Sequence, residues 1–243
     1  MLGISPARLL TNNDSVLKVE LHTHSADDPI DRIGHTTAEL IDRAAELNYD
    51  ALAVTLHDRQ LDLEPLQDHA ASRGITLIPG IERTIEGKHV LLLNFRRGAE
   101  DVRTFEDLAR LKARERGLVI APHPFFPTRS CLGGRLMDRH AALFDAVEVN
   151  AMSTRAVNLS RRAERWARTH GKPLVGNGDV HRLRQLGTTY SLIEAERHPD
   201  AICEAVRAGR VQVKARPISL VQAGVLMTEL FGTGLAGVIF PQA

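Results

Sequence analysis

Histidines and acidic residues recur along this chain where strand-like segments end. Two histidines one residue apart, His22 and His24, close the segment 18–24. In an extended chain residues i and i+2 share one face, so both imidazoles can reach a single ion. Taken alone, the pair is equally compatible with surface histidines. Later segments supply further candidates at comparable places: His57, Glu82, His89, His123, Asp179 and His181.

These candidates are more numerous than the four ligands of one tetrahedral ion. Such a set indicates two or three divalent ions that share a bridging carboxylate, for which Glu82 is the natural choice. Mixed imidazole and carboxylate ligands suit Zn, Mn or Fe. An aspartate of the loop 25–31 is a possible further ligand, although acidic residues are also common in solvated turns. His35 could likewise bind metal, but a surface histidine beside a helix is favoured.

Apolar segments and helical patterns alternate through most of the chain. Strands are predicted at 18–24, 50–55, 75–78, 88–95, 118–121, 144–150 and 173–175. Helices are predicted at 36–47, 64–73, 104–116 and around 159–167. This alternation favours parallel pairing with the helices outside, as in an α/β barrel. The candidate ligands then fall at the carboxyl ends of the strands, the barrel face that carries active sites.

The remaining segments complete the expected domain. Pro79-Gly80 is expected to break the third strand. From Ser191 onward the pattern predicts a helix at 200–208, a strand at 210–214 and an apolar helix at 219–231. The segment 232–237 fits GxGxxG but lacks a following βαβ unit, so it is interpreted as a flexible tail. We expect an N-terminal extension at 1–17 and a single barrel domain at 18–243.

Composition narrows the classes of function. The 243 residues are 43% hydrophobic and 25% charged, as in an ordinary soluble globular protein. Lysine plus arginine (31) nearly balances aspartate plus glutamate (30), so no global field favours nucleic acid or anionic lipid. No signal peptide or membrane span is evident, and two cysteines without CxxC spacing imply neither a disulfide framework nor a zinc ribbon. We expect a cytoplasmic protein that acts on a small molecule.

Six segments resemble the ligand motifs of the polymerase and histidinol phosphatase (PHP) superfamily. In chain order they are Leu21-His-Thr-His24, Thr55-Leu-His57, Pro79-Gly-Ile-Glu82, His89-Val-Leu-Leu92, Ala121-Pro-His-Pro124 and Gly178-Asp-Val-His181. Each motif is weakly specific, whereas their common order and spacing over residues 18–183 is specific. The resemblance implies a distorted (β/α)7 TIM-like barrel that holds up to three metal ions.

The resemblance also implies which residues bind each ion. His22, His24, Glu82 and Asp179 would hold the first ion, and Glu82, His89 and His123 the second. His57, His181 and a loop aspartate would hold the third, and we take Asp28 as that aspartate. The chain departs from the family at Leu56, where an aspartate is usual, and in the loop Ala26-Asp-Asp-Pro29, which is longer than the usual Ser-Asp-Gly.

The resemblance implies hydrolysis of a phosphate ester, with a metal-activated water attacking phosphorus. Asp179 and His181 are the expected catalytic residues, and His181 could protonate the leaving group. Arg129 and Arg182 follow ligand motifs directly and could clamp phosphate, although either could be an ordinary surface arginine. The expected substrate is a small phosphomonoester or phosphodiester.

Three alternatives have different consequences. A nuclease would act on nucleic-acid phosphodiesters, but the near-neutral charge ranks it lower. An amidohydrolase barrel also begins with His-x-His, yet no lysine follows a strand end as its bridging ligand would. A metal-stabilised regulatory module would need the ligands but no turnover.

Overall fold

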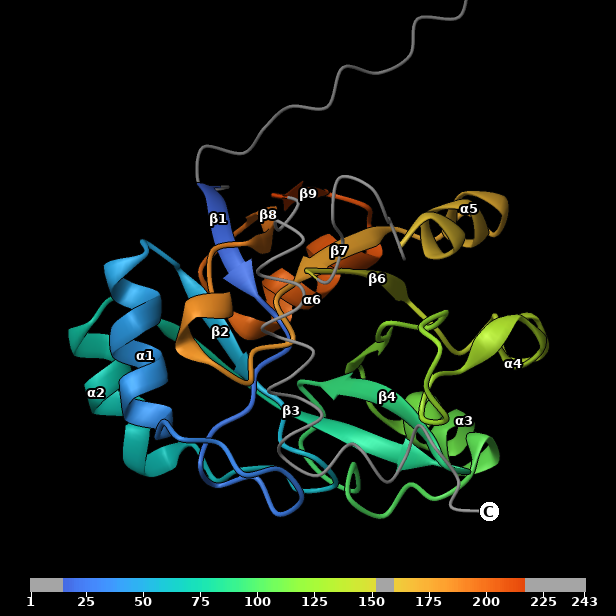
Figure 1. The fold of residues 1–243 in the computed structure, drawn as a ribbon, viewed down its shortest axis with the longest axis horizontal. Helices are drawn as coiled ribbons and strands as arrows, with labels where there is room; N and C mark the ends of the chain where they lie inside the picture. The colour runs from blue at the N-terminus through green and yellow to red at the C-terminus, as the bar shows by residue number, and fades with distance from the viewer. Residues whose placement is uncertain (1–14, 152–159, 217–243) are drawn as a thin grey trace, which may run out of the picture.

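A twisted sheet of nine strands forms the centre of the described part of the chain. The computed structural model describes residues 15–151 and 160–216. The strands are β1 (Ser15–Glu20), β2 (Ala51–Val54), β3 (Thr76–Ile85), β4 (Lys88–Leu93), β5 (Leu118–Ala121), β6 (Ala146–Asn150), β7 (Leu174–Asn177), β8 (Thr189–Ala195) and β9 (Val211–Ala215). Their order in the sheet is β7-β6-β5-β4-β3-β2-β1-β8-β9. The sheet curls into a barrel with helices outside it (Figure 1).

Pairing directions only partly match the expected parallel sheet. The β1, β2 and β3 strands pair in parallel, and so do β5, β6 and β7. The β4 strand is antiparallel to both of its neighbours, because it returns from β3 through a two-residue turn. Glu86 and Gly87 have φ angles of 49° and 75° in this turn, as a tight hairpin requires. The uniformly parallel sheet was therefore a wrong prediction at β4.

The expected break at Pro79-Gly80 was also wrong, because β3 continues through it to Ile85. The carbonyl of Pro79 accepts a hydrogen bond from the main chain of Asn94. A Cβ on Gly80 would lie 2.7 Å from Leu93 Cδ2 and 2.9 Å from Thr55 Cγ2. Glycine is thus required here for β3 to pass between its neighbours, and the continued strand carries Glu82 into the barrel.

Seven strands close the barrel at one end. Beyond the last residues of β1 and β7, the main chain of Val180 donates to His22 and accepts from His24, at 3.1 and 3.0 Å. Towards the other end, the β8–β9 hairpin lies between β1 and β7. There the Ser191 hydroxyl of β8 joins it to β7 by accepting from the Gly176 N–H and donating to the Gly176 carbonyl. The predicted distorted (β/α)7 barrel is confirmed, with the β8–β9 hairpin as an addition.

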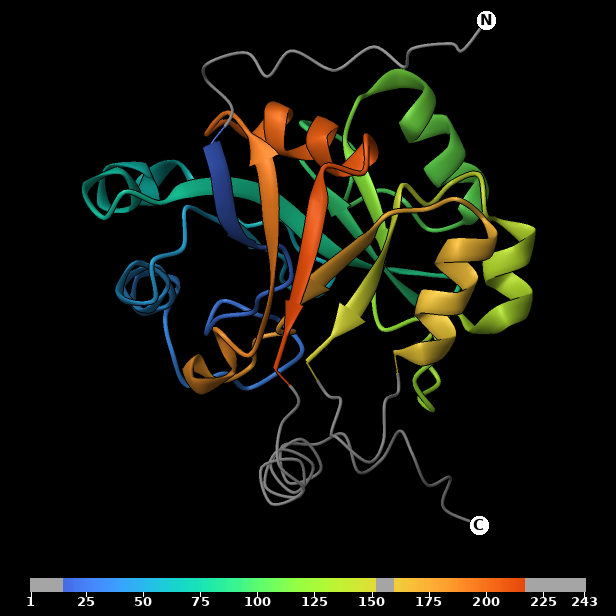
Figure 2. The ribbon, with the colours of Figure 1, turned by 90° about the horizontal axis from the view of Figure 1, so that it is seen from above.

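Helices cover the sheet on opposite sides and at one end (Figure 2). The helices are α1 (Thr37–Glu46), α2 (Gln67–Ser72), α3 (Phe105–Arg114), α4 (Gly133–Arg139), α5 (Arg161–Thr169) and α6 (Pro199–Arg207), with short 3₁₀ turns at Glu64–Leu66 and Leu183–Gln185. The α1 and α2 helices lie on one side, and α3, α4 and α5 lie on the other. Ile202, Cys203 and Val206 of α6 join the residues inside the barrel in one apolar cluster, so α6 closes its base.

Several local predictions can be compared directly with this structure. The α1, α3 and α6 helices lie where the apolar pattern predicts them, and α1 begins with a capping box at Thr36. The α4 helix and the β8 strand were not predicted. Leu159, the predicted helix at 219–231 and the glycine pattern at 232–237 lie outside the described residues. None of the helices at residues 15–151 and 160–216 is long and apolar enough to cross a membrane.

Replacement of the bridging serine tests how the barrel is closed. We expect Ser191→Ala to lower the free energy of unfolding by about 1–3 kcal/mol, since it leaves a buried N–H and a buried carbonyl of Gly176 unpaired. Denaturant unfolding followed by circular dichroism measures the change. Ser72→Ala, at the exposed end of α2, is the matched control and should shift stability by less than about 0.5 kcal/mol. Equal stability of the two variants would contradict the bridging role.

Candidate metal centre

The expected ligands meet at the closed end of the barrel. His22 and His24 follow β1, His57 follows β2, and His123 follows β5 at a left-handed φ of 28°. Asp179 and His181 follow β7, and Asp179 also has a positive φ of 49°. Two of the expected ligands do not follow the end of a strand. Glu82 lies inside β3, and His89 lies near the start of β4, which runs in the opposite direction.

Glu82 lies at the centre of the cluster, and its two oxygens face different sets of histidines. Its Oε1 is 2.8 Å from His89 Nδ1 and 3.2 Å from His123 Nε2. Its Oε2 is 3.2–3.3 Å from the Nε2 atoms of three other histidines: His22, His24 and His57. The carboxylate is 1% exposed. This division of the two oxygens is what a carboxylate bridging two ions requires.

Asp179 completes a second cluster beside Glu82. Its Oδ1 lies 3.4 Å from His22 Nε2 and 3.6 Å from His24 Nε2. All three atoms are buried and make no hydrogen bond among the described residues. Unpaired polar atoms that converge in a buried place are costly unless a cation or water joins them. The donor set therefore fits a divalent ion at this position.

A third cluster joins His24, His57 and His181, whose ligand atoms lie within 4.8 Å of one another. Asp31 reaches it from the loop, with Oδ2 3.0 Å from His181 Nε2 and 4.0 Å from His57 Nδ1. Hydrogen bonding to His181 lowers the pKa of Asp31, so its carboxylate remains charged near neutral pH.

The structure places Asp28, our expected third-site ligand, behind the imidazoles. Its Oδ2 accepts hydrogen bonds from Nδ1 of His24 and of His57, at 3.0 and 2.9 Å. In both rings Nδ1 is opposite the Nε2 atom that faces Glu82. The other oxygen, Oδ1, accepts from the main chain of Ile30 and Asp31. Asp28 thus holds the loop against two candidate ligands and orients both rings.

Glu148 has the same role on the opposite side and was missed by the sequence analysis. Its Oε2 lies 2.8 Å from His22 Nδ1, and its Oε1 accepts from the main chain of His123 at 3.2 Å. Asn150 and Asn177 donate to the same carboxylate. A glutamate within the otherwise apolar segment Val147–Val149 was the available signal, because a charge in a fully buried strand requires partners.

The charges of the cluster are strongly coupled. Burial alone would lower the pKa of His22, but the carboxylates of Asp179, Glu148 and Glu82 outweigh burial and raise it to about 10. Burial alone would raise the pKa of Glu82, but His89, His22 and His57 hold it well below its usual value. A site in which carboxylates are held ionised next to imidazoles is prepared to exchange protons for divalent cations.

The remaining candidates have different surroundings. His35, expected at the surface, is buried and contacts the His24 carbonyl through Nε2 at 3.0 Å. Arg182 is half-buried, and its guanidinium donates to the His181 carbonyl, at the edge of the third cluster. Arg129 is exposed, and its carbonyl accepts a bond from Lys88. Cys131 contacts His123 Nδ1 through Sγ at 3.3 Å, so it can orient that ring.

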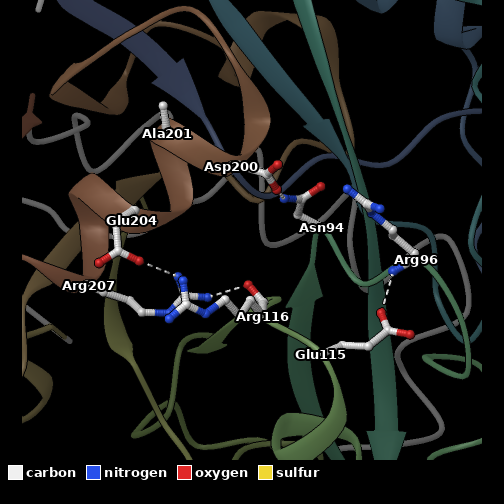
Figure 3. A pocket seen from close by; sticks show the side chains of 8 residues that line it. All are labelled: Asn94, Arg96, Glu115, Arg116, Asp200, Ala201, Glu204 and Arg207. Carbon is white, nitrogen blue, oxygen red and sulfur yellow. Dashed lines mark hydrogen bonds and ion pairs between the residues drawn. The ribbon is translucent and has the colours of Figure 1, made fainter.

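A cavity of about 630 Å³ lies away from the cluster, at the base of the barrel (Figure 3). It lies between α6 and the segments around Arg96 and Arg116. Its acidic residues are engaged locally: Asp200 accepts from Asn94, and Glu204 pairs with Arg207. None of the expected ligands lines this cavity. The candidate site is therefore the cluster of histidines and carboxylates at the opposite end, here named the metal cluster for the ions that it could hold.

Comparison with known proteins supports the family resemblance. Residues 159–211 match the model of the family described as PHP-associated, which overlaps the end of the region that carries the six motifs. No curated protein sequence matches the chain.

Three solved structures share the fold. A two-domain protein of Bacteroides vulgatus, which contains a predicted PHP-like metal-dependent phosphoesterase, is 17% identical and superposes with a TM-score of 0.67 over 88% of this chain and 70% of its own. PsfC of Pseudomonas syringae is 20% identical, with a TM-score of 0.62 over 90% and 99%. A lesion-specific endonuclease, EndoQ of Pyrococcus furiosus, is 16% identical, with a TM-score of 0.58 over 88% and 66%. At these identities the likeness is one of fold.

The Glu148 network gives a testable expectation for metal affinity. Glu148→Gln keeps the size of the side chain but removes the charge that holds His22 Nδ1, so we expect metal to bind about 10–100-fold more weakly. Titration against a fluorescent chelator measures this change. Glu194→Gln, at an exposed position of β8, is the control and should bind metal like the parent protein. Unchanged affinity in Glu148→Gln would refute the orienting role.

Proposed function

Because this chain has the barrel of the PHP superfamily, we propose that it is a metal-dependent hydrolase of phosphate esters. The observation that carries the proposal is the divided carboxylate of Glu82, with each oxygen facing its own group of histidines. An array of this kind suits two adjacent divalent ions, and paired ions are well matched to a phosphoryl group and its charged oxygens.

Three groups of residues would hold the ions. His22, His24, Glu82 and Asp179 would hold the first, and Glu82, His89 and His123 the second. His57, His181 and Asp31 would hold the third, with Asp28 as an orienting residue. When bound, divalent ions of this kind neutralise charge on phosphate oxygens and lower the pKa of water.

Side chains of the protein would supply a proton to the leaving group and bind the phosphate. His181 is 13% exposed, and its Nδ1 lies 3.1 Å from the Asp179 carbonyl, so the ring is held at the edge of the pocket. When the third position holds no ion, the other ring nitrogen, Nε2, which lies 3.0 Å from Asp31, can deliver a proton to the leaving oxygen. Arg182, fixed on the His181 carbonyl, would contact a phosphate oxygen, and Arg129 would approach from the loop that carries His123.

Phosphate release from metal-loaded protein tests the proposal. We expect turnover of nitrophenyl phosphate or its phosphodiester with Mn or Zn, and a loss of at least about 100-fold in Glu82→Gln, since the bridge then carries no charge. Glu64→Gln, at an exposed position outside the site, should keep full activity. Absence of turnover on both ester classes by folded, metal-loaded protein would favour a non-catalytic metal module.

Two variants distinguish a ligand role of Asp31 from an orienting role of Asp28 at the third site. Asp31→Asn should lose one ion per chain and keep the others at parental affinity, because the close contacts of Asp31 are with His181 and His57, both assigned to the third ion. Asp28→Asn should weaken several ions together, because it orients both His24 and His57. Elemental analysis after stepwise chelation counts the ions. Loss of a single ion in Asp28→Asn but none in Asp31→Asn would reverse the two assignments.

Nuclease activity is the second candidate. The endonuclease that shares this fold shows that the barrel can carry such chemistry, while the net charge of +1 speaks against a strong general attraction to nucleic acid. The distribution of charged side chains over the surface is more relevant to nuclease activity than the net charge of the whole chain.

A further inference from the structure

Charge is separated between opposite sides of the barrel. The α4 and α5 helices carry six arginines and only two acidic residues, Asp138 and Glu164. On the other side, α1, α2 and the 3₁₀ turn before α2 carry five acidic residues and one arginine. The two groups of helices lie on opposite sides of the sheet (Figures 1 and 2). The net charge of +1 therefore conceals a strongly dipolar surface.

The six arginines are exposed and form two neighbouring rows, here named the arginine face. It consists of Arg135, Arg139, Arg161, Arg162, Arg165 and Arg168. On α5, Arg161, Arg165 and Arg168 follow at i, i+4 and i+7, which puts them on one side of the helix. On α4, Arg135 and Arg139 are spaced i, i+4. None of the six pairs with a carboxylate among the described residues, in contrast to Arg73 and Arg110 elsewhere.

The two acidic residues within this region only partly offset its charge, because six guanidinium groups outnumber two carboxylates. Asp138 accepts a hydrogen bond from the Trp166 indole at 2.7 Å, which fixes α4 beside α5. Glu164 is half-buried. The side chains that reach solvent from the two helices are thus mainly guanidinium groups, which are suited to phosphate by their planar, bidentate donors.

The arginine face begins at the rim of the metal cluster. The Arg162 guanidinium lies 5.0 Å from the centre of the Phe125 ring, two residues after His123. The next residue, Phe126, stands edge-on to the His123 ring, at 6.2 Å between centroids. Two consecutive phenylalanines thus link α5 to a candidate metal ligand, one in contact with Arg162 and the next in contact with His123.

We propose that the arginine face binds the phosphate backbone of a nucleic acid and leads it to the metal cluster. A repeating phosphate polymer matches rows of guanidinium groups that outnumber the acidic residues of the same helices, and such contacts need no base recognition. Phe126 beside the cluster offers a ring on which an unpaired base can stack. Cleavage of the bound strand rests on the proposed hydrolase function, whereas binding to the face does not.

The test separates binding from cleavage by using chelator-treated protein and a labelled single-stranded DNA of about 20 nucleotides. Anisotropy should report binding whose affinity falls steeply with salt. In the triple variant Arg161→Gln, Arg165→Gln, Arg168→Gln we expect at least about tenfold weaker binding and a salt slope shallower by about two to three, as for the loss of three phosphate contacts. Glutamine retains helix propensity, so α5 should persist.

A matched triple variant controls for total charge. Arg96→Gln, Arg97→Gln, Arg116→Gln removes three exposed arginines from the base of the barrel and should leave DNA affinity unchanged. Both triple variants should turn over nitrophenyl phosphodiester like the parent protein. Equal binding by the two triple variants would overturn the assignment of the face, and displacement of DNA by polyglutamate of matched charge would assign it to an acidic protein partner instead.

The two proposals fail in different ways. Turnover of small esters without any binding of DNA would overturn only the role of the arginine face. Binding of DNA through the face, with no hydrolysis of any ester by metal-loaded protein, would overturn the hydrolase and leave the nucleic-acid partner.

Discussion

A buried carboxylate surrounded by imidazoles is the constraint on which the rest of this structure depends. Glu82 is almost fully buried, and an ionised group in such a place is unfavourable by several kcal/mol unless it is paired. Five histidines lie within 3.3 Å of its oxygens. They come from β1, β2, β4 and β5, so the pairing of one side chain requires that four other strands reach the same end of the barrel.

The backbone meets this requirement through departures from a regular barrel. Gly80 lets β3 run on towards the cluster, and the turn at Glu86-Gly87 brings His89 back beside Glu82. Left-handed backbone at His123 and Asp179 turns both side chains into the pocket, at an energetic cost that is usual at functional sites. Asp28 and Glu148 then hold these rings from behind through hydrogen bonds, which keeps the candidate ligand atoms aligned.

The candidate metal centre lies inside the barrel, whereas the charged surface that would select a substrate lies on the helices outside it. The part of its interior near the base is apolar and closed by α6, whereas its helices differ sharply in charge from one side to the other. Because surface charges are screened over about 8 Å at physiological ionic strength, local patches rather than the net charge decide which polyanions approach. The nearly balanced composition is thus compatible with a basic path beside the metal cluster.

The sequence indicated the types and order of the candidate ligands and the alternation of strands and helices, because these depend on residue chemistry and local periodicity. The tertiary structure alone decided the antiparallel course of β4, the place of β8, and the roles of Asp28, Asp31 and Glu148. Apart from the β3–β4 hairpin, those features depend on contacts between residues far apart in the chain, such as Asp31 and His181, which are 150 positions apart, and no local pattern specifies them. The same reason explains the arginine face, since only packing brings α4 and α5 together and sets them opposite the acidic helices.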